Sequence, residues 1–87
     1  MKMIILIVKD NDADDVTQAL TADKYRVTRV ASTGGFLRSG IVTLLIGVSD
    51  ERAELVLQLI RNTLPPLSSG EKRATLFVIP VEKFEQV

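Results

Sequence analysis

A glycine-rich segment in the first half of the chain holds the residue types best suited to binding an anionic ligand. Successive glycines let several backbone amides point into one concavity, which suits an anion. Arg26 and Thr28 lie on one face of the strand expected before these glycines, and Arg38 lies among them. Phe36 and Leu37 are able to hold a flat heterocycle. The pattern predicts a ligand that combines negative charge with a ring.

A purely structural explanation of this segment stays open. A glycine-rich connection is more often only a turn, and Phe36 and Leu37 would then fill a neighbouring subunit. The segment is not a phosphate-transfer loop, because no Lys-Ser/Thr pair follows its glycines as in a Walker motif. It also lacks the strand-to-helix context of a dinucleotide fingerprint. Hydrolysis is therefore not indicated.

The chain lacks residue types on which much of ordinary enzyme chemistry depends. Histidine and cysteine are both absent, which excludes a cysteine nucleophile, a histidine base, disulfides and most zinc sites. The 11 basic and 11 acidic side chains cancel, so no overall field attracts nucleic acid or an anionic membrane. We expect no catalysis, no metal site and no cofactor.

Length and hydropathy indicate one globular domain over residues 1–87. A chain of 87 residues with 46% hydrophobic and 25% charged residues has the composition of a globular protein and room for a single core. The apolar run at residues 3–8 is too short for a secretory core region or a membrane span. We therefore expect a soluble cytoplasmic protein.

Two groups of charged residues are better explained by structure than by binding. Four aspartates follow the first apolar run, at Asp10, Asp12, Asp14 and Asp15. They lack the twelve-residue loop and terminal glutamate of a calcium site, so helix capping is favoured, with Asn11 as the cap. Lys72 and Arg73 are expected to form a solvated charged edge.

The order of the expected elements predicts a ferredoxin-like α+β fold. Alternation and apolar runs indicate four strands, at residues 3–8, 25–32, 41–48 and 74–81. Helical spacing indicates two helices, from Asn11 to about Ala22 and from a cap at Ser49 or Asp50 to about Asn62. A linker at residues 64–73 and a tail at 82–87 complete a βαββαβ order, with four antiparallel strands and two helices on one face.

Two helices are able to cover only one face of such a sheet. The first, third and fourth strands are apolar on both faces, so their open face is expected to meet another protein surface. Because oligomers of identical chains favour closed symmetry, we expect a homotrimer or a homodimer.

Segments along most of the chain resemble the PII-like cyclic-di-AMP receptor family. The matching segments are residues 1–5, the run STGGFLRSG at 32–40, residues 43–48 and 74–81, and Phe84 followed by Gln86. The resemblance implies a ferredoxin-like homotrimer without catalysis. Such a trimer binds cyclic di-AMP, or a related nucleotide, in three inter-subunit clefts and addresses a partner protein by a change in loop conformation.

The resemblance also implies which residues contact the ligand. Contacts are expected from the second strand, the glycine loop, the third strand and the tail, at Arg26, Thr28, Gly35, Phe36, Leu37, Gly47 and Gln86. In this pattern Gly47 allows close approach of the ligand.

Two positions depart from the family pattern. Ile41 follows the loop glycine where the family typically has an asparagine that reads a base edge, and losing that hydrogen bond typically costs about 1 to 3 kcal/mol. Residues 64–73 replace a much longer loop, the expected output arm. Two alternatives therefore stay open: binding of another adenine nucleotide, ATP or ADP, and a ligand-free trimeric module that binds a partner protein.

Overall fold

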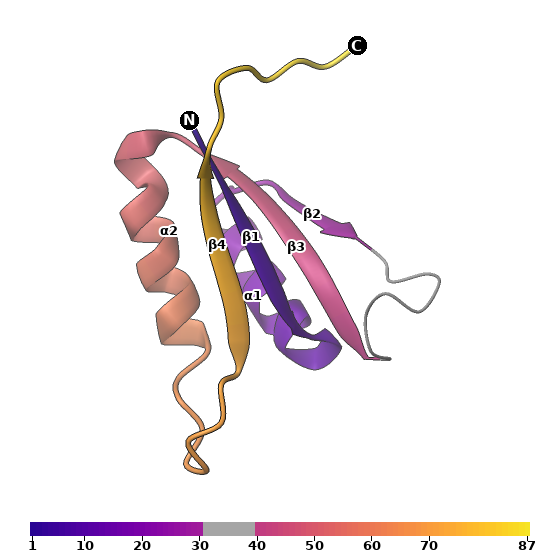
Figure 1. Ribbon diagram of the computed structural model, residues 1–87, viewed down its shortest axis with the longest axis vertical. Coiled ribbons are helices and arrows are strands. Elements are labelled where there is room, and N and C mark those ends of the chain that lie inside the picture. Colours follow the sequence, from indigo (N-terminus) through magenta and orange to yellow (C-terminus); the bar gives the residue numbers. More distant parts are fainter. Residues whose placement is uncertain (31–39) are drawn as a thin grey trace.

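The computed structural model describes residues 1–30 and 40–87. Its elements, in chain order, are β1 (Lys2–Lys9), α1 (Asp10–Ala22), β2 (Val27–Val30), β3 (Ile41–Val48), α2 (Asp50–Thr63) and β4 (Ala74–Pro80) (Figure 1). The predicted order of strands and helices is confirmed. The third strand has the predicted bounds, and within the described residues the second strand is shorter than predicted.

The strands form one antiparallel sheet in the order β2-β3-β1-β4, so β1 and β3 are central. Ile5 of β1 lies opposite Leu45 of β3 and Phe77 of β4, and Thr28 of β2 lies opposite Leu45. Directly opposed residues of antiparallel strands share a face. These four side chains therefore form one row across the same face of the sheet.

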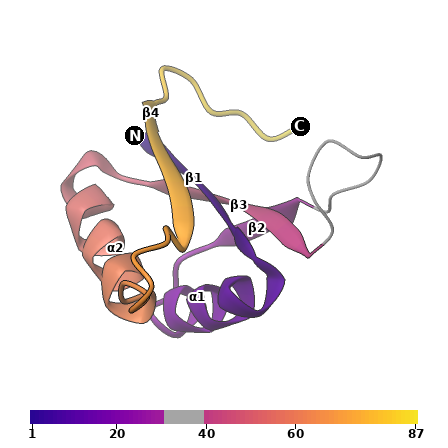
Figure 2. The ribbon, with the colours of Figure 1, turned by 60° about the horizontal axis from the view of Figure 1, so that its bottom comes forward.

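Both helices pack on the other face, as Figure 2 shows. Alternate residues of each strand point to that face, and those of the central strands are buried there, among them Ile4, Leu6, Leu44 and Ile46. The helices contribute apolar residues at helical spacing, at Ala13, Val16 and Leu20 of α1 and Val56, Leu57 and Ile60 of α2. The hydrophobic core therefore lies between the helices and one face of the sheet.

The face opposite the helices is apolar and uncovered in the single chain. Phe77 and Ile79 of β4 keep 52% and 44% of their surface exposed on it. Their partners on β1, Ile5 and Met3, are only half-buried. The predicted uncovered apolar face is thus present in the fold.

The capping role predicted for Asn11 is wrong. Helix α1 begins at Asp10 directly after β1, and Lys9 takes the cap position without a side-chain hydrogen bond. The Asn11 side chain instead accepts a hydrogen bond from the neighbouring N–H of Asp12, at 3.0 Å. The first N–H of the helix, that of Asp10, donates to the Gly40 carbonyl at 2.8 Å. The backbone carbonyl of the residue before β3 therefore satisfies a donor that a side-chain cap would serve.

Helix α2 begins as predicted, after Ser49. The Ser49 side chain makes no capping hydrogen bond, but its carbonyl accepts one from the Arg52 N–H at 3.1 Å. Among residues 1–30 and 40–87, neither helix has the length and apolar character needed to cross a membrane.

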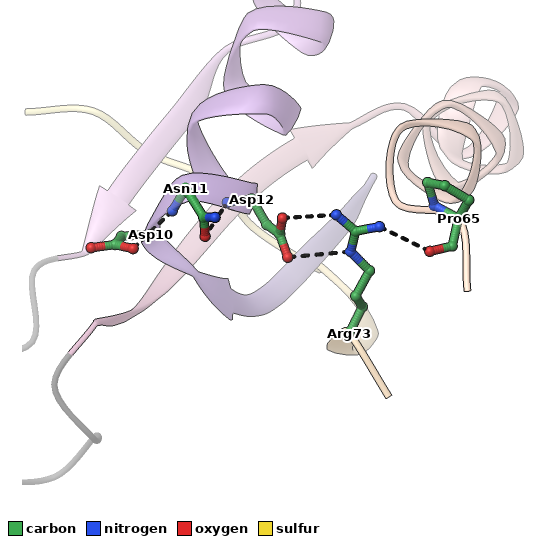
Figure 3. A network of polar contacts seen from close by, with 5 residues as sticks. All are labelled: Asp10, Asn11, Asp12, Pro65 and Arg73. Atoms are coloured by element: carbon green, nitrogen blue, oxygen red, sulfur yellow. Dashed lines mark hydrogen bonds and ion pairs between the residues drawn. The ribbon is translucent and has the colours of Figure 1, made fainter. Parts of the chain in front are cut away.

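The prediction that Arg73 lies on a solvated charged edge is also wrong. Its guanidinium forms two hydrogen bonds with the buried Asp12 carboxylate, Nη2 to Oδ1 at 3.0 Å and Nε to Oδ2 at 3.4 Å (Figure 3). The Asp12 hydrogen bonds raise the pKa of Arg73 above its ordinary value. This fork joins the start of α1 to the last residue before β4.

Replacing Asp12 with Ala should lower the free energy of unfolding by about 1 to 2 kcal/mol, because charge-assisted hydrogen bonds to a half-buried cation are lost. The matched control is Asp14→Ala, which removes an exposed pair with Arg29 at 2.7 Å. That change should cost less than about 1 kcal/mol. Urea denaturation of the two variants measures the difference, and equal losses would contradict a structural role for the Asp12 fork.

Candidate functional site

The structure brings three of the predicted ligand contacts together on the open face of the sheet. Thr28 lies opposite Leu45, which places its side chain on the open face. Arg26 directly precedes β2, and because Tyr25 and Val27 on either side of it pack against the core, its side chain is directed to the open face; Arg26 and Thr28 are both exposed. Gly47 lies two residues beyond Leu45 on the adjacent strand, and therefore on the same face, opposite Met3. The Arg26 guanidinium, the Thr28 hydroxyl and the backbone of Gly47, which carries no side chain, are thus neighbours.

Gly47 leaves the backbone of β3 open to close approach. A Cβ atom at this position would lie 3.1 Å from the terminal methyl of Met1, and no other atom is that close. The Met1 side chain therefore borders the bare backbone on the open face. A glycine within a strand commonly marks a place where a ligand or another backbone approaches closely.

The N-terminus and the end of β4 meet at the same end of the sheet as Gly47. The Met1 carbonyl accepts a hydrogen bond from the N–H of Val81, the residue that follows β4, at 3.0 Å. The Met1 amine forms an ion pair with Asp50 Oδ1 at 2.8 Å, and this contact lowers the pKa of the Asp50 carboxyl. The tail that carries Gln86 therefore starts beside the site.

The tail itself extends on the side of the sheet away from the helices (Figure 2). Gln86 is exposed. Among the hydrogen bonds between described residues, none joins Gln86 to Arg26 or Thr28. The structure thus does not bring this predicted contact together with the others, although the tail starts at the end of the sheet where Gly47 lies.

Arg26 and Arg29 differ in the face of the sheet on which they lie and in whether a carboxylate pairs with them. Arg29 lies opposite Leu44 on the helix-covered face, and it pairs with Asp14 of α1 at 2.7 Å. Arg26 lies on the open face, and it has no ion-pair partner within the described part of the chain. An exposed cation without a carboxylate beside it attracts an anionic ligand.

Residues 31–39, which include most of the glycine-rich segment, lie outside the described residues. Among them are the predicted ligand contacts Gly35, Phe36 and Leu37, together with Arg38. The geometry of the candidate site therefore comes from the two strands and the tail.

The site on the open face is a surface in the single chain. A pocket of about 900 Å³ lies at the opposite end of the sheet, where Gly40 meets the start of α1, and a second of about 440 Å³ lies between α2 and the linker. Neither pocket is lined by Arg26, Thr28 or Gly47. A ligand bound to these residues would need a second wall from elsewhere to be enclosed.

The described walls of the larger pocket have no excess of positive charge. They carry cations and carboxylates in equal number, at Lys9, Lys72 and Arg73 and at Asp10, Asp12 and Glu71. Arg73 is already paired with Asp12. Within residues 1–30 and 40–87, no group of three or more acidic side chains is placed to hold a metal ion.

Comparison with known proteins gives a family and a solved structure. The family model described as cyclic-di-AMP receptor matches residues 1–67, which include Arg26, Thr28 and Gly47. The crystal structure of a functionally unknown protein from Pediococcus pentosaceus ATCC 25745 superposes with a TM-score of 0.76 at 33% sequence identity. That match covers 99% of this chain and 96% of the other, so it also includes β4 and the tail.

Replacing Gly47 with Ala should change the free energy of unfolding by less than about 1 kcal/mol, because the added methyl meets only the movable end of Met1. The control is Ile46→Ala, one residue away on the buried face, which should cost about 2 to 5 kcal/mol. Urea denaturation measures both. A large loss at Gly47 would mean that packing within the chain, rather than access to the open face, requires this glycine.

Proposed function

The chain belongs to the cyclic-di-AMP receptor family, and on this premise we propose that it is a signal-transduction protein that binds cyclic di-AMP. The observation that carries the proposal is the exposed Arg26, without a carboxylate partner among the described residues, beside Thr28 and the bare backbone of Gly47. These groups provide the charge, the hydroxyl and the access that an anionic nucleotide needs.

Each group has a distinct role toward the ligand. The Arg26 guanidinium donates charge-assisted hydrogen bonds to a phosphate, which are the stronger kind of hydrogen bond. The Thr28 hydroxyl donates to a second oxygen of the ligand. Gly47 allows a planar adenine to lie against the strand, with the Met1 methyl at its border. Binding and signalling, rather than catalysis, is what a receptor with these groups performs.

We place the ligand in clefts between the subunits of a homotrimer. In one chain the site is an open surface, and Phe77 and Ile79 leave about half of their area exposed on the same face. A second copy against this face would bury those side chains and supply the missing wall. Assembly and ligand enclosure would then have the same physical cause. Relay to a partner protein completes the proposed function.

A ligand-free interaction module is the second candidate. The exposed Phe77 and Ile79 favour it, because an apolar face drives association whether or not a nucleotide is present. Ile41, without a polar group to read a base, also favours it. Titration with nucleotides separates the two functions.

Isothermal titration with cyclic di-AMP, cyclic di-GMP, ATP and ADP tests the proposal, with light scattering on the same sample for the particle mass. We expect saturable binding of cyclic di-AMP at one ligand per subunit in a trimer. Preferential binding of ATP or ADP would keep the site and change its ligand. No heat with any of the four nucleotides would contradict the receptor function and favour the interaction module.

Arg26→Ala should weaken cyclic di-AMP binding by at least about tenfold, because a charge-assisted hydrogen bond to phosphate is lost. The trimer mass should not change. The matched control is Arg29→Ala, which removes the same side chain from the covered face. Its affinity should stay within about twofold of the original protein. Equal losses in both variants would place the ligand elsewhere or indicate a non-specific charge effect.

A further inference from the structure

Both sulfur atoms of the chain lie beside Gly47. The sequence contains two methionines and no cysteine. Met3 of β1 lies directly opposite Gly47 on the open face of the sheet. The terminal methyl of Met1 would be 3.1 Å from a Cβ atom at Gly47. The two thioethers therefore border the same segment of backbone, which carries no side chain of its own.

Two polar contacts hold Met1 in this place. Its carbonyl accepts the hydrogen bond from the N–H of Val81 at 3.0 Å, and its amine pairs with Asp50 at 2.8 Å. Met1 nevertheless keeps 44% of its surface exposed, and Met3 is only half-buried. Both side chains are thus positioned by the fold and remain accessible to a ligand.

The groups around Gly47 follow one row across the open face. Continuing the pairing of β2 with β3 by one residue places Arg26 beside Gly47. Met3 lies on the other side of Gly47, and Ile79 lies beyond Met3. Because two strand spacings amount to about 10 Å, the row places a cation and a thioether about that far apart, with only the backbone of Gly47 between them.

A thioether is well suited to contact an aromatic ring. Its sulfur is polarisable and makes favourable contacts at ring edges, and the unbranched methionine side chain adapts to the shape of its neighbour. A ring that lies flat against the backbone of Gly47 presents its edge to Met3 and Met1. A phosphate attached to that ring then lies toward Arg26.

We propose that Met1 and Met3 hold the nucleotide ring at Gly47 and that their oxidation weakens ligand binding. This inference rests on the proposed function. Hydrogen peroxide transfers one oxygen atom to a thioether sulfur: the O–O bond breaks, the sulfur is oxidised to the sulfoxide, and the reduced peroxide leaves as water. The sulfoxide is polar, so its oxygen must lose water before a ring is able to pack against it. The ring contact is thus also a site of oxidative modification.

Protection from oxidation tests the ring contact. The full chain is treated with dilute hydrogen peroxide, with and without cyclic di-AMP, and peptide mass spectrometry follows the oxygen added to each methionine. Bound ligand should slow the oxidation of both residues by at least about fivefold. In the control Arg26→Ala, at a ligand concentration too low to occupy that variant, the protection should be lost. Oxidation at the same rate with saturating ligand would overturn the proposal.

Titration of variants measures what the Met3 side chain contributes. Met3→Ala should weaken cyclic di-AMP binding by at least about fivefold. The matched control is Ile7→Ala, which truncates another half-buried residue of β1 on the same face, opposite Thr43 and away from Gly47. Its affinity should stay within about twofold of the original protein. Equal losses in the two variants would overturn a role of Met3 at the ring. If Met3→Ala fails to fold, the protection experiment on the unmodified chain decides.

Light scattering separates the ring contact from assembly. The oxidised protein should keep the particle mass of the untreated protein and bind cyclic di-AMP at least about tenfold more weakly. A loss of particle mass together with affinity would assign the methionines to assembly and overturn their role at the ring. Binding that is indifferent both to oxidation and to Met3→Ala would overturn this inference alone. If the untreated protein binds no nucleotide, the proposed function fails and this inference fails with it.

Discussion

A four-stranded sheet has two faces, and the two helices of this chain bury only one of them. Ile4 and Leu6 of β1 are fully enclosed by the helices, whereas their neighbours Met3 and Ile5 remain half-buried on the other side. Phe77 and Ile79 of β4 continue that second face. An exposed apolar surface of this kind commonly marks a place where a partner or ligand binds. In the proposed function, assembly and ligand binding both depend on what lies against the open face.

Strand alternation decides which charges are available on that face. Arg26 and Arg29 are only three residues apart, but they point to opposite sides of the sheet. Arg29 is neutralised by Asp14 of the covering helix, whereas Arg26 remains beside Gly47 with no carboxylate partner among the described residues. The same residue type is therefore paired within the fold on one face and left open to a ligand on the other, and the two arginines serve as controls for each other.

The Asp12–Arg73 fork gives the short linker a defined place in the fold. Without it, a segment that contains two prolines, two serines and a glycine would have few constraints between α2 and β4. With it, both ends of the linker follow α1, and α1 follows Gly40 through a backbone hydrogen bond. Contacts through α1 thereby connect the residue before β3 to both ends of the short linker.

Local periodicity in the sequence determined the order of the elements and the bounds of the strand at residues 41–48. It also determined the shared face of Arg26 and Thr28, because the alternation of side chains along a strand depends on only a few residues. The resemblance to cyclic-di-AMP receptors also required only local motifs. Only the tertiary structure decided that Asp10 begins the helix in place of an Asn11 cap, and that Arg73 is paired rather than solvated. Asp12 and Arg73 are 61 residues apart, and their contact depends on how α1 and the linker pack against the same end of the sheet. Spacing along the chain does not predict such a contact, because the burial and the pairing of two charged residues are set by how the core packs.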